Sequence, residues 1–422
     1  MTRAPSVHTF ANGTTLICDP VAGYETLAVS VVAGRGARWE TAAQSGWSHL
    51  LEHMVFKGAG PRSAREIVEA IEGQGGQLNA ATGHERTSFQ VRALSDGLPL
   101  ALEITADLVQ HPTLDEDDLT REKQVVQQEI AEAADTPDDQ VFETAQGAAF
   151  TGQPLGRPIL GRDDSLAAAT PAALEAWRAA LYAPERLVVS VAGAVEEDEF
   201  LGLAERHFAA AVPSATPAAP PATFEGGVVC ESRKLEQAHL VFLLPAPGVA
   251  DPDHWALRLF AELLGGGMSS RLFQEARERL GLAYAIDAYV DVYADVGVLG
   301  VYAGCAAKDA GDLAQVAASE IRALAARVEA AELARGQAQL KASLFMGRES
   351  LLARAEQAAA QQLAFGRLLP AGEIAAAIDA VTPRDMTRLG ARLLAPGRHA
   401  VSALGPRSAA SAGKRFAAAL AG

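Results

Sequence analysis

The chain has 422 residues, 49% of them hydrophobic, and carries 52 acidic against 36 basic side chains, a net charge of −16. This length exceeds one ordinary hydrophobic core and predicts two sizeable domains. The acidity argues against nucleic acid as a partner, because nucleic-acid affinity depends on cationic groups that neutralise phosphates. The apolar runs fall short of the roughly 20 residues that span a bilayer, which argues against a membrane protein.

The cysteines and the N-terminus indicate in which cellular compartment the protein is expected. Cys18, Cys230 and Cys305 are odd in number and far apart, which favours a reducing environment without a disulfide framework. The first residues lack the apolar segment of a secretory signal. A cytoplasmic enzyme or scaffold is therefore expected. The acidity itself has two interpretations: a solvated surface, or a negative interior that favours cationic peptides.

In chain order, the two halves show the same succession of elements. Strand-like runs open them, at residues 13–19 and 25–34 in the first half and at residues 238–247 in the second. A helix pair follows, and paired strands come next at residues 76–94 and 283–304. Long helical stretches then follow, such as residues 314–345. Because the strands are grouped and hairpin-linked, the fold class is α+β. We expect two similar α/β-sandwich domains, each a mostly antiparallel sheet packed with helices, from an internal duplication.

A break in composition separates the two halves. Residues 210–227, AAVPSATPAAPPATFEGG, are rich in Pro and Ala and have little hydrophobic periodicity, as in a semi-rigid linker. The sequence therefore predicts an N-terminal domain over residues 1–212, a linker over residues 213–226 and a C-terminal domain over residues 227–422.

The segment SGWSHLLEHMVFKG, residues 45–58, carries the first candidate site. Ser45 or Ser48 can cap a helix that runs to Gly58. His49 and His53 are four residues apart and share one helix face, so both imidazoles can bind one tetrahedral zinc ion. Glu52 projects toward the same face, where it can reach a zinc-bound water. This H-x-x-E-H order is a zinc-peptidase signature, although a helix without metal is the alternative.

A catalytic zinc site usually has three protein ligands, so a third is required. The predicted helix over residues 114–139 offers carboxylates. Glu122 and Glu129 lie seven apart, two turns along one stripe, and Glu132 follows one turn later. Acidic residues on a helix are usually solvated, so the residues alone leave open which of the three, if any, binds metal.

Five segments together resemble the pitrilysin/insulinase-type (inverzincin) zinc metallopeptidases, and most closely the bacterial proteins similar to mitochondrial processing peptidase. The segments are HLLEHMVFKG, GGQLNAATGHERTSF, REKQVVQQEIAE, LGGGMSSRLFQEARERLGLAY and QLKASLFMGRES. They occur in both halves in the family's order. The resemblance implies one zinc ion per chain, with Glu129, 76 positions after His53, as the third ligand. It also implies that Glu122 is an auxiliary glutamate that orients the ligands.

The same resemblance implies roles for four further residues. Arg277 and Tyr284 match the family's Arg and Tyr, which hold the substrate and contact the developing oxyanion. Asn79 and Ala80 match a strand edge that pairs with an extended peptide. The segment ATGHERTSF departs from the commoner version, which contains Ser, so the neighbouring substrate contacts are less well defined.

The predicted function is that of a zinc endopeptidase that hydrolyses unfolded peptides enclosed between domains, with Glu52 as general base. Basic peptides are favoured by the net charge. The alternatives are a non-catalytic core subunit, as in the respiratory chain, and one half of a heterodimeric peptidase. Because this chain carries both the zinc motif and the Arg/Tyr pair, and its two domains are half of the family's four-domain assembly, we expect a homodimer with shared active sites.

Overall fold

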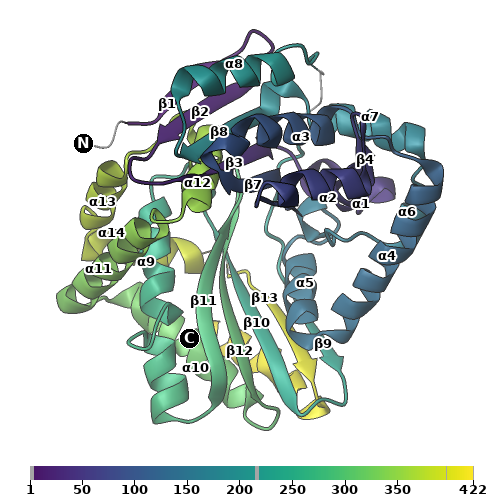
Figure 1. The fold of residues 1–422 in the computed structure, drawn as a ribbon. Coiled ribbons are helices and arrows are strands. Elements are labelled where there is room, and N and C mark those ends of the chain that lie inside the picture. The colour runs from purple at the N-terminus through teal and green to yellow at the C-terminus, as the bar shows by residue number, and fades with distance from the viewer. Residues whose placement is uncertain (1–3, 214–217, 396, 422) are drawn as a thin grey trace. The chain divides into compact units, whose positions relative to one another are not determined.

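The computed structural model describes residues 4–213, 218–395 and 397–421 (Figure 1). The chain forms two compact units that interleave along the sequence. The first unit comprises Met1–Ala131, Pro158–Pro220 and Met346–Leu368. The second comprises Glu132–Arg157, Pro221–Phe345 and Leu369–Gly422.

The first unit is built on a six-stranded sheet. In spatial order its strands are β1 (Ser6–Thr9), β2 (Thr15–Pro20), β8 (Leu187–Gly193), β3 (Thr26–Ala33), β7 (Thr87–Leu94) and β6 (Gln77–Thr82). Only the β2–β8 pair is parallel. A two-stranded hairpin, β4 (Gly58–Ala59) with β5 (Arg62–Ser63), lies outside this sheet.

Helices cover both faces of this sheet. Its helices are α1 (Trp47–Val55), α2 (Ala64–Gly73), α3 (Leu98–Gln110), α4 (Glu116–Asp135), α6 (Asp163–Ala167), α7 (Pro171–Leu181), α8 (Glu197–Phe208) and α12 (Leu351–Phe365). Successive strand residues point to opposite faces, so Val29 and Val31 of β3 join the large core, whereas Val32 faces Ala358 and Ala359 of α12. The last turn of α4 belongs to the second unit.

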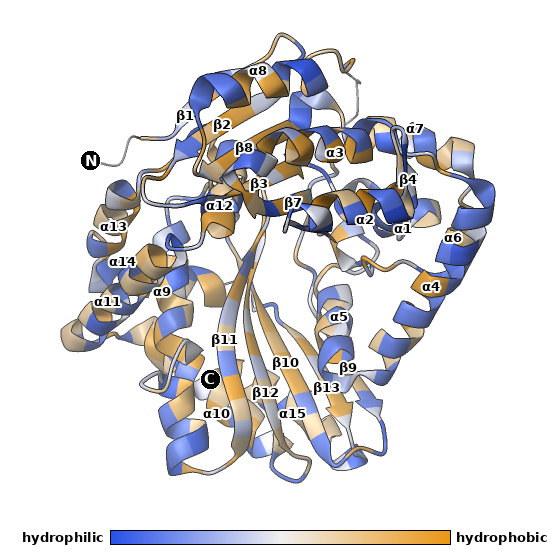
Figure 2. Ribbon diagram, viewed as in Figure 1, coloured by the Kyte–Doolittle hydropathy of each residue, from blue (hydrophilic) through white to orange (hydrophobic). Residues whose placement is uncertain are grey.

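The second unit has a five-stranded sheet. In spatial order its strands are β11 (Ala283–Val292), β12 (Gly297–Ala306), β10 (Gln237–Ala246), β13 (Ala400–Gly405) and β9 (Gly227–Ser232). Its helices are α5 (Pro137–Ala149), α9 (His254–Gly265), a π-helix (Phe273–Arg279), α10 (Ala310–Ala326), α11 (Ala330–Gly347), α13 (Ala371–Asp379), α14 (Pro383–Leu394) and α15 (Ala412–Ala421). Figure 2 shows β10 largely hydrophobic and α4 largely hydrophilic.

In the second sheet, too, successive strand residues point alternately into two hydrophobic cores. Leu240 and Phe242 of β10 pack with α9, α10 and α15, whereas Val241 and Leu243 pack against α5. A strand with apolar side chains on both faces requires helices on both faces, and the unit provides them.

The two sheets repeat one strand order. The order β2-β8-β3-β7-β6 corresponds to β9-β13-β10-β12-β11, with a parallel first pair and antiparallel pairs thereafter. The predicted α+β class, with two similar, mostly antiparallel domains, is confirmed. Among the described residues, no helix is both long and apolar enough to cross a bilayer.

The predicted domain boundaries are contiguous, whereas the structural units exchange a helix. α5 comes from the first half of the chain but packs on the second sheet, and α12 comes from the second half but packs on the first sheet. Amphipathic helices bury against whichever apolar face is available, so sequence order does not identify the sheet. The chain passes from one unit to the other between Pro220 and Pro221. The predicted linker 213–226, part of which lies outside the described residues, stays a prediction.

A buried ion pair fastens α12 to the first sheet. Arg354 donates from Nε to Oδ2 and from Nη2 to Oδ1 of Asp19 on β2, both at 2.9 Å. Asp19 is only 2% exposed. A bidentate ion pair of this kind fixes the orientation of the helix as well as its distance from the strand.

We expect Arg354→Gln to lower the free energy of unfolding by about 3–5 kcal/mol, because it leaves the Asp19 carboxylate buried without its cation. The double variant Asp19→Asn/Arg354→Gln removes that charge and should recover part of the loss. Urea-induced unfolding of the three proteins measures both effects. A single variant as stable as the wild type would show that the pair does not hold α12 in place.

Candidate metal centre

The helix that carries the two histidines begins at a buried carboxylate. Glu40 accepts hydrogen bonds from the backbone N–H groups of Gly46, at 2.9 Å, and Ser48, at 2.7 Å. These groups lie at the start of α1, where backbone donors have no partner within the helix and a negative charge is favourable. Gly46 has a φ of 88°, in the left-handed region that favours glycine. Glu40 therefore fixes where α1 starts.

Two tryptophans hold the same helix from the side. The Trp47 indole donates to the carbonyl of Ser165 at 2.9 Å, and the Trp177 indole donates to the hydroxyl of Ser48 at 3.2 Å. Leu50, Leu51 and the other inward residues of α1 are fully buried. The opposite face of the helix, with His49 and His53, is left half-buried.

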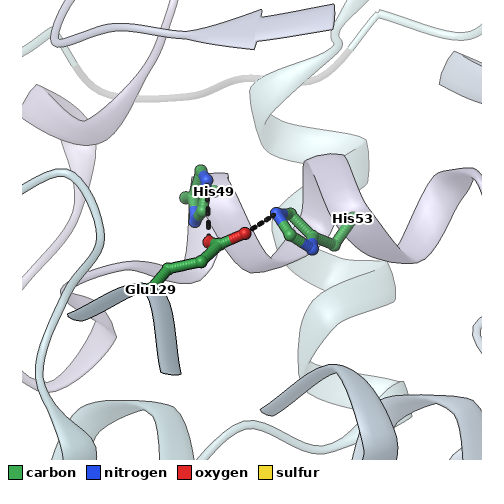
Figure 3. A group of neighbouring side chains, drawn as sticks. All are labelled: His49, His53 and Glu129. Carbon is green, nitrogen blue, oxygen red and sulfur yellow. Dashed lines mark ion pairs between the residues drawn. The ribbon is translucent and has the colours of Figure 1, made fainter. Parts of the chain in front are cut away.

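The side chains of His49, His53 and Glu129 converge (Figure 3). The Nε2 atom of His49 lies 3.8 Å from Oε2 of Glu129, and Nε2 of His53 lies 3.6 Å from Oε1. One ligand atom from each of the three residues falls within a group no wider than 4.8 Å. The two histidines come from successive turns of α1, and the glutamate comes from α4.

This geometry fits a zinc ion. Ligand atoms about 2.0–2.1 Å from a tetrahedral ion lie roughly 3.3 Å from one another, close to the distances found here. The contacts are also too long for hydrogen bonds, and Oε2 of Glu129 is buried without a hydrogen-bond partner among the described residues. Two imidazoles and one carboxylate are a known donor set for catalytic zinc.

Glu122 lies behind His53. Its Oε2 is 3.1 Å from Nδ1 of His53, and its Oε1 is 2.7 Å from Nζ of Lys57. Because Glu122 is buried, a charged carboxylate there requires such partners. With Nδ1–H donating to Glu122, the lone pair of His53 is on Nε2, the atom that faces Glu129.

Glu52 lies beside the cluster and is held from another element. Its Oε2 accepts a hydrogen bond from the hydroxyl of Thr82, at the end of β6, at 2.5 Å. Burial raises the pKa of Glu52, and the bond to Thr82 acts in the opposite direction. Burial, together with Glu52, also raises the pKa of Tyr182, whose hydroxyl is buried nearby. The carboxyl of Glu52 thus lies in a desolvated setting.

The remaining acidic and strand residues lie as follows. Glu132 is exposed in the last turn of α4, and its backbone carbonyl accepts a hydrogen bond from Thr136. Asn79 and Ala80 lie on β6, an edge strand, with Asn79 exposed and Ala80 half-buried. Among the described residues β6 pairs only with β7, so its other edge offers backbone groups that are not part of the sheet.

Arg277 and Tyr284 belong to the second unit. Arg277 lies in the π-helix Phe273–Arg279, with its guanidinium carbon 4.7 Å from the centre of the Phe273 ring. Tyr284 is the second residue of β11 and is 77% exposed, next to an irregularity in the β11–β12 register. π-Helical turns are rare and are frequent at functional sites.

Three residues of this site were not predicted from the sequence: Glu40, Lys57 and Thr82. Lys57 lies two residues beyond the end of α1, so the sequence places it near His53 but does not indicate its pairing with Glu122. Glu40 precedes the helix by several residues, and Thr82 lies 30 positions from its partner. The sequence contains no signal for these two contacts.

Two family models match the chain. Residues 22–163 match the model described as Insulinase (Peptidase family M16), and residues 168–340 match the model described as Peptidase M16 inactive domain. A relative from Rickettsia felis, described as an uncharacterized zinc protease, is 35% identical over 376 residues, which cover 89% of this chain and 91% of the relative.

Two solved structures share the fold. A protease from Helicobacter pylori matches with a TM-score of 0.88 at 21% identity, covering 96% of this chain and 100% of that chain. A chain of Complex III2 from Candida albicans matches with a TM-score of 0.85 at 20% identity, covering 98% of this chain and 99% of that chain. At these identities the likeness concerns the fold alone.

The burial of His49 predicts a pH effect on the metal-free protein. Burial, and then the neighbouring His53, lower the pKa of His49 from 6.5 to about 4. Between these two values the unfolded chain takes up a proton that the folded protein does not, so stability falls as the pH falls from 6.5 to 4. The loss should be at most about 3 kcal/mol.

Chelated wild type and chelated His49→Gln, unfolded with urea at several pH values, measure this contribution. The wild type should lose more stability over that range than the variant. His254, whose pKa burial also lowers to about 4, is present in both proteins and therefore cancels in the comparison. Equal pH slopes would show that His49 does not resist protonation.

Proposed function

This chain belongs to the insulinase family of peptidases, family M16, and from this premise we propose that it is a zinc-dependent endopeptidase acting on unfolded peptides. One observation carries the proposal: His49, His53 and Glu129 converge at ligand spacing, with the Glu52 carboxyl held beside them. A donor set of two imidazoles and a carboxylate, next to a further carboxyl that does not join it, is what zinc-dependent peptide hydrolysis requires.

Each ligand would be prepared by its surroundings. The Nε2 atoms of His49 and His53, with a carboxylate oxygen of Glu129, would hold one zinc ion per chain. His49 is neutral near pH 7, because burial lowers its pKa to about 4. Glu122 would orient the His53 ring through Nδ1, and Lys57 would balance the charge of Glu122.

Zinc, when bound, would lower the pKa of a water molecule toward 7 and polarise the peptide carbonyl. Glu52 would act as general base: its carboxylate accepts a proton as the water attacks the carbonyl carbon. It then passes that proton to the nitrogen of the leaving amine. The desolvated setting that raises its pKa favours the first transfer, because it makes the carboxylate a stronger base than one in water.

Substrate binding would involve two further elements. The exposed edge of β6, at Asn79 and Ala80, is suited to pair with an extended peptide as an added strand. Arg277 and Tyr284 would hold the peptide and donate hydrogen bonds to the developing oxyanion. The exposure of Tyr284 and the π-helix around Arg277 are consistent with that role.

The net charge of −16 suggests that basic peptides are preferred. Matched basic and acidic peptides, compared at low and high salt, measure this preference, and equal rates at low salt would contradict it. The three cysteines, which form no disulfide among the described residues, suit a reducing, cytoplasmic setting.

A non-catalytic role is the second candidate. The family model over residues 168–340 is described as an inactive domain, and the fold matches a chain of Complex III2. A purely structural subunit has no need to keep His49, His53, Glu129 and Glu52 together. Pairing with a different, related chain is the third possibility, and it is less economical because this chain carries both residue sets.

The proposal predicts that the purified protein contains about one zinc per chain and that a chelator abolishes peptide cleavage, which added zinc restores. Glu129→Gln should lose metal and activity together. Glu122→Gln should weaken zinc binding roughly 10–100-fold, because Glu122 orients a ligand and is not itself one. Zinc content by elemental analysis and cleavage of a fluorogenic peptide are the measurements.

Two variants are the controls for that series. Glu132→Gln is on the same helix but exposed, so it should change neither zinc content nor activity. Glu52→Gln should keep zinc and lose activity by roughly 10²–10⁴-fold, as expected for loss of a general base. Full activity in metal-free wild type would refute the mechanism, and loss of zinc in Glu132→Gln alone would place the third ligand elsewhere on α4.

We further propose a homodimer in which each active site is shared. The His49/Glu52/His53/Glu129 cluster of one copy would face Arg277 and Tyr284 of the other. Glu52→Gln and Tyr284→Phe are each expected to be defective. When they are mixed under conditions that exchange subunits, a shared arrangement creates one wholly wild-type site in each mixed dimer, and activity should rise above that of either parent.

If each site is instead built within one chain, every site in the mixture still carries one lesion. No gain in activity, with subunit exchange confirmed independently by mass, would therefore reject the shared site. Sedimentation of the wild type as a monomer would reject it as well.

A further inference from the structure

The hydroxyl of Thr82 donates a hydrogen bond to the Glu52 carboxylate, and this contact has no role in the proposed reaction steps. It donates to Oε2 at 2.5 Å from the last residue of β6, 30 positions further along the chain. A glutamate side chain has three rotatable bonds, so its carboxylate is not fixed by the helix alone. A donor on Oε2 fixes one oxygen and leaves Oε1 to accept a proton.

Thr82 is itself held firmly. It pairs with Thr87 across the β6–β7 hairpin. The hairpin tip is fastened to the segment before α1, because Ala37 N–H donates to Gly83 at 3.0 Å and Arg38 N–H donates to His84 at 2.8 Å.

The side chain of Arg38 strengthens the same attachment. It is 3% exposed and pairs with Glu85 at the hairpin tip at 2.5 Å. Two residues after Arg38, Glu40 caps the start of α1. The helix, the segment before it and the hairpin therefore form a closed ring, and the bond from Thr82 to Glu52 is where that ring closes.

We propose that Thr82 is a positioning residue for Glu52, and that it holds the general base in register with the peptide-binding strand. This inference rests on the proposed function. Asn79 and Ala80 lie three and two residues before Thr82 on the same strand. A peptide paired with β6 and the Glu52 carboxylate would then both be positioned by the same strand.

The Thr82 hydroxyl can be removed with little change in shape. Thr82→Val keeps the branched side chain that suits a strand and the backbone of β6, but loses the hydroxyl. Thr82→Ser keeps the hydroxyl and loses only a methyl group. We expect Thr82→Val to lower kcat roughly 10–100-fold, the effect of one hydrogen bond to a charged group, with KM and zinc content unchanged. Thr82→Ser should stay within about 3-fold of the wild type.

A purely structural role would give a different pattern. If Thr82 acts through Glu52, then adding Thr82→Val to Glu52→Gln should cost little more, because the group that it positions is already gone. If the two losses multiply instead, Thr82 acts independently of Glu52 and the proposal is overturned. Thr82→Ala, which also lacks the hydroxyl, should behave like Thr82→Val and replaces it if the valine variant does not fold.

A readout that does not depend on activity separates this inference from the proposed function. Crystal structures of the zinc-loaded variants should show the Glu52 carboxylate displaced in Thr82→Val and in place in Thr82→Ser. If the wild type cleaves no peptide but Glu52 moves in this way, the positioning stands and the peptidase proposal fails. If Glu52 keeps its place and kcat is unchanged in Thr82→Val, the positioning role is wrong.

Discussion

The rest of the candidate centre depends on one interaction, the hydrogen bonds from the start of α1 to the buried carboxylate of Glu40. α1 has only nine residues, fewer than the roughly 12–15 that make an isolated helix even marginally stable. Its start is fixed by the two hydrogen bonds to Glu40, and its rotation by Trp47 and Trp177. His49, Glu52 and His53 all lie within the following two turns. A shift in the first turn of α1 would therefore move every one of them.

The centre also has to keep neutral imidazoles and charged carboxylates in one partly desolvated place. Burial solves the first requirement, because it lowers the pKa of His49 and keeps the ring uncharged. The carboxylates need compensation, and each has its own. Glu122 has Lys57 and His53, and Glu52 has the hydroxyl of Thr82. Within the described part of the chain, Glu129 keeps a buried oxygen without a hydrogen-bond partner, which suits a bound cation.

The repeated sheets explain why neither half of the sequence makes a complete unit. Each sheet has apolar side chains on both faces and needs helices on both. The helix on the second face comes from the other half of the chain in each case, α12 for the first sheet and α5 for the second. The buried ion pair of Arg354 with Asp19 also holds the exchanged helix α12 on the first sheet. The two halves of the chain are thus joined by the exchanged helices as well as by the linker.

The sequence by itself determined what depends on local periodicity. The four-residue spacing of His49 and His53 places them on one face of any helix, and the seven-residue spacing of Glu122 and Glu129 does the same on α4. Hydrophobic alternation predicted the sheets. Spacing alone did not decide which carboxylates meet the histidines, because Glu122, Glu129 and Glu132 are chemically alike; the family resemblance implied Glu129 and Glu122, and the tertiary structure places these two beside the histidines. Thr82, Glu40 and the exchange of α5 and α12 depend on contacts between segments far apart in the chain, and local spacing carries no information about those.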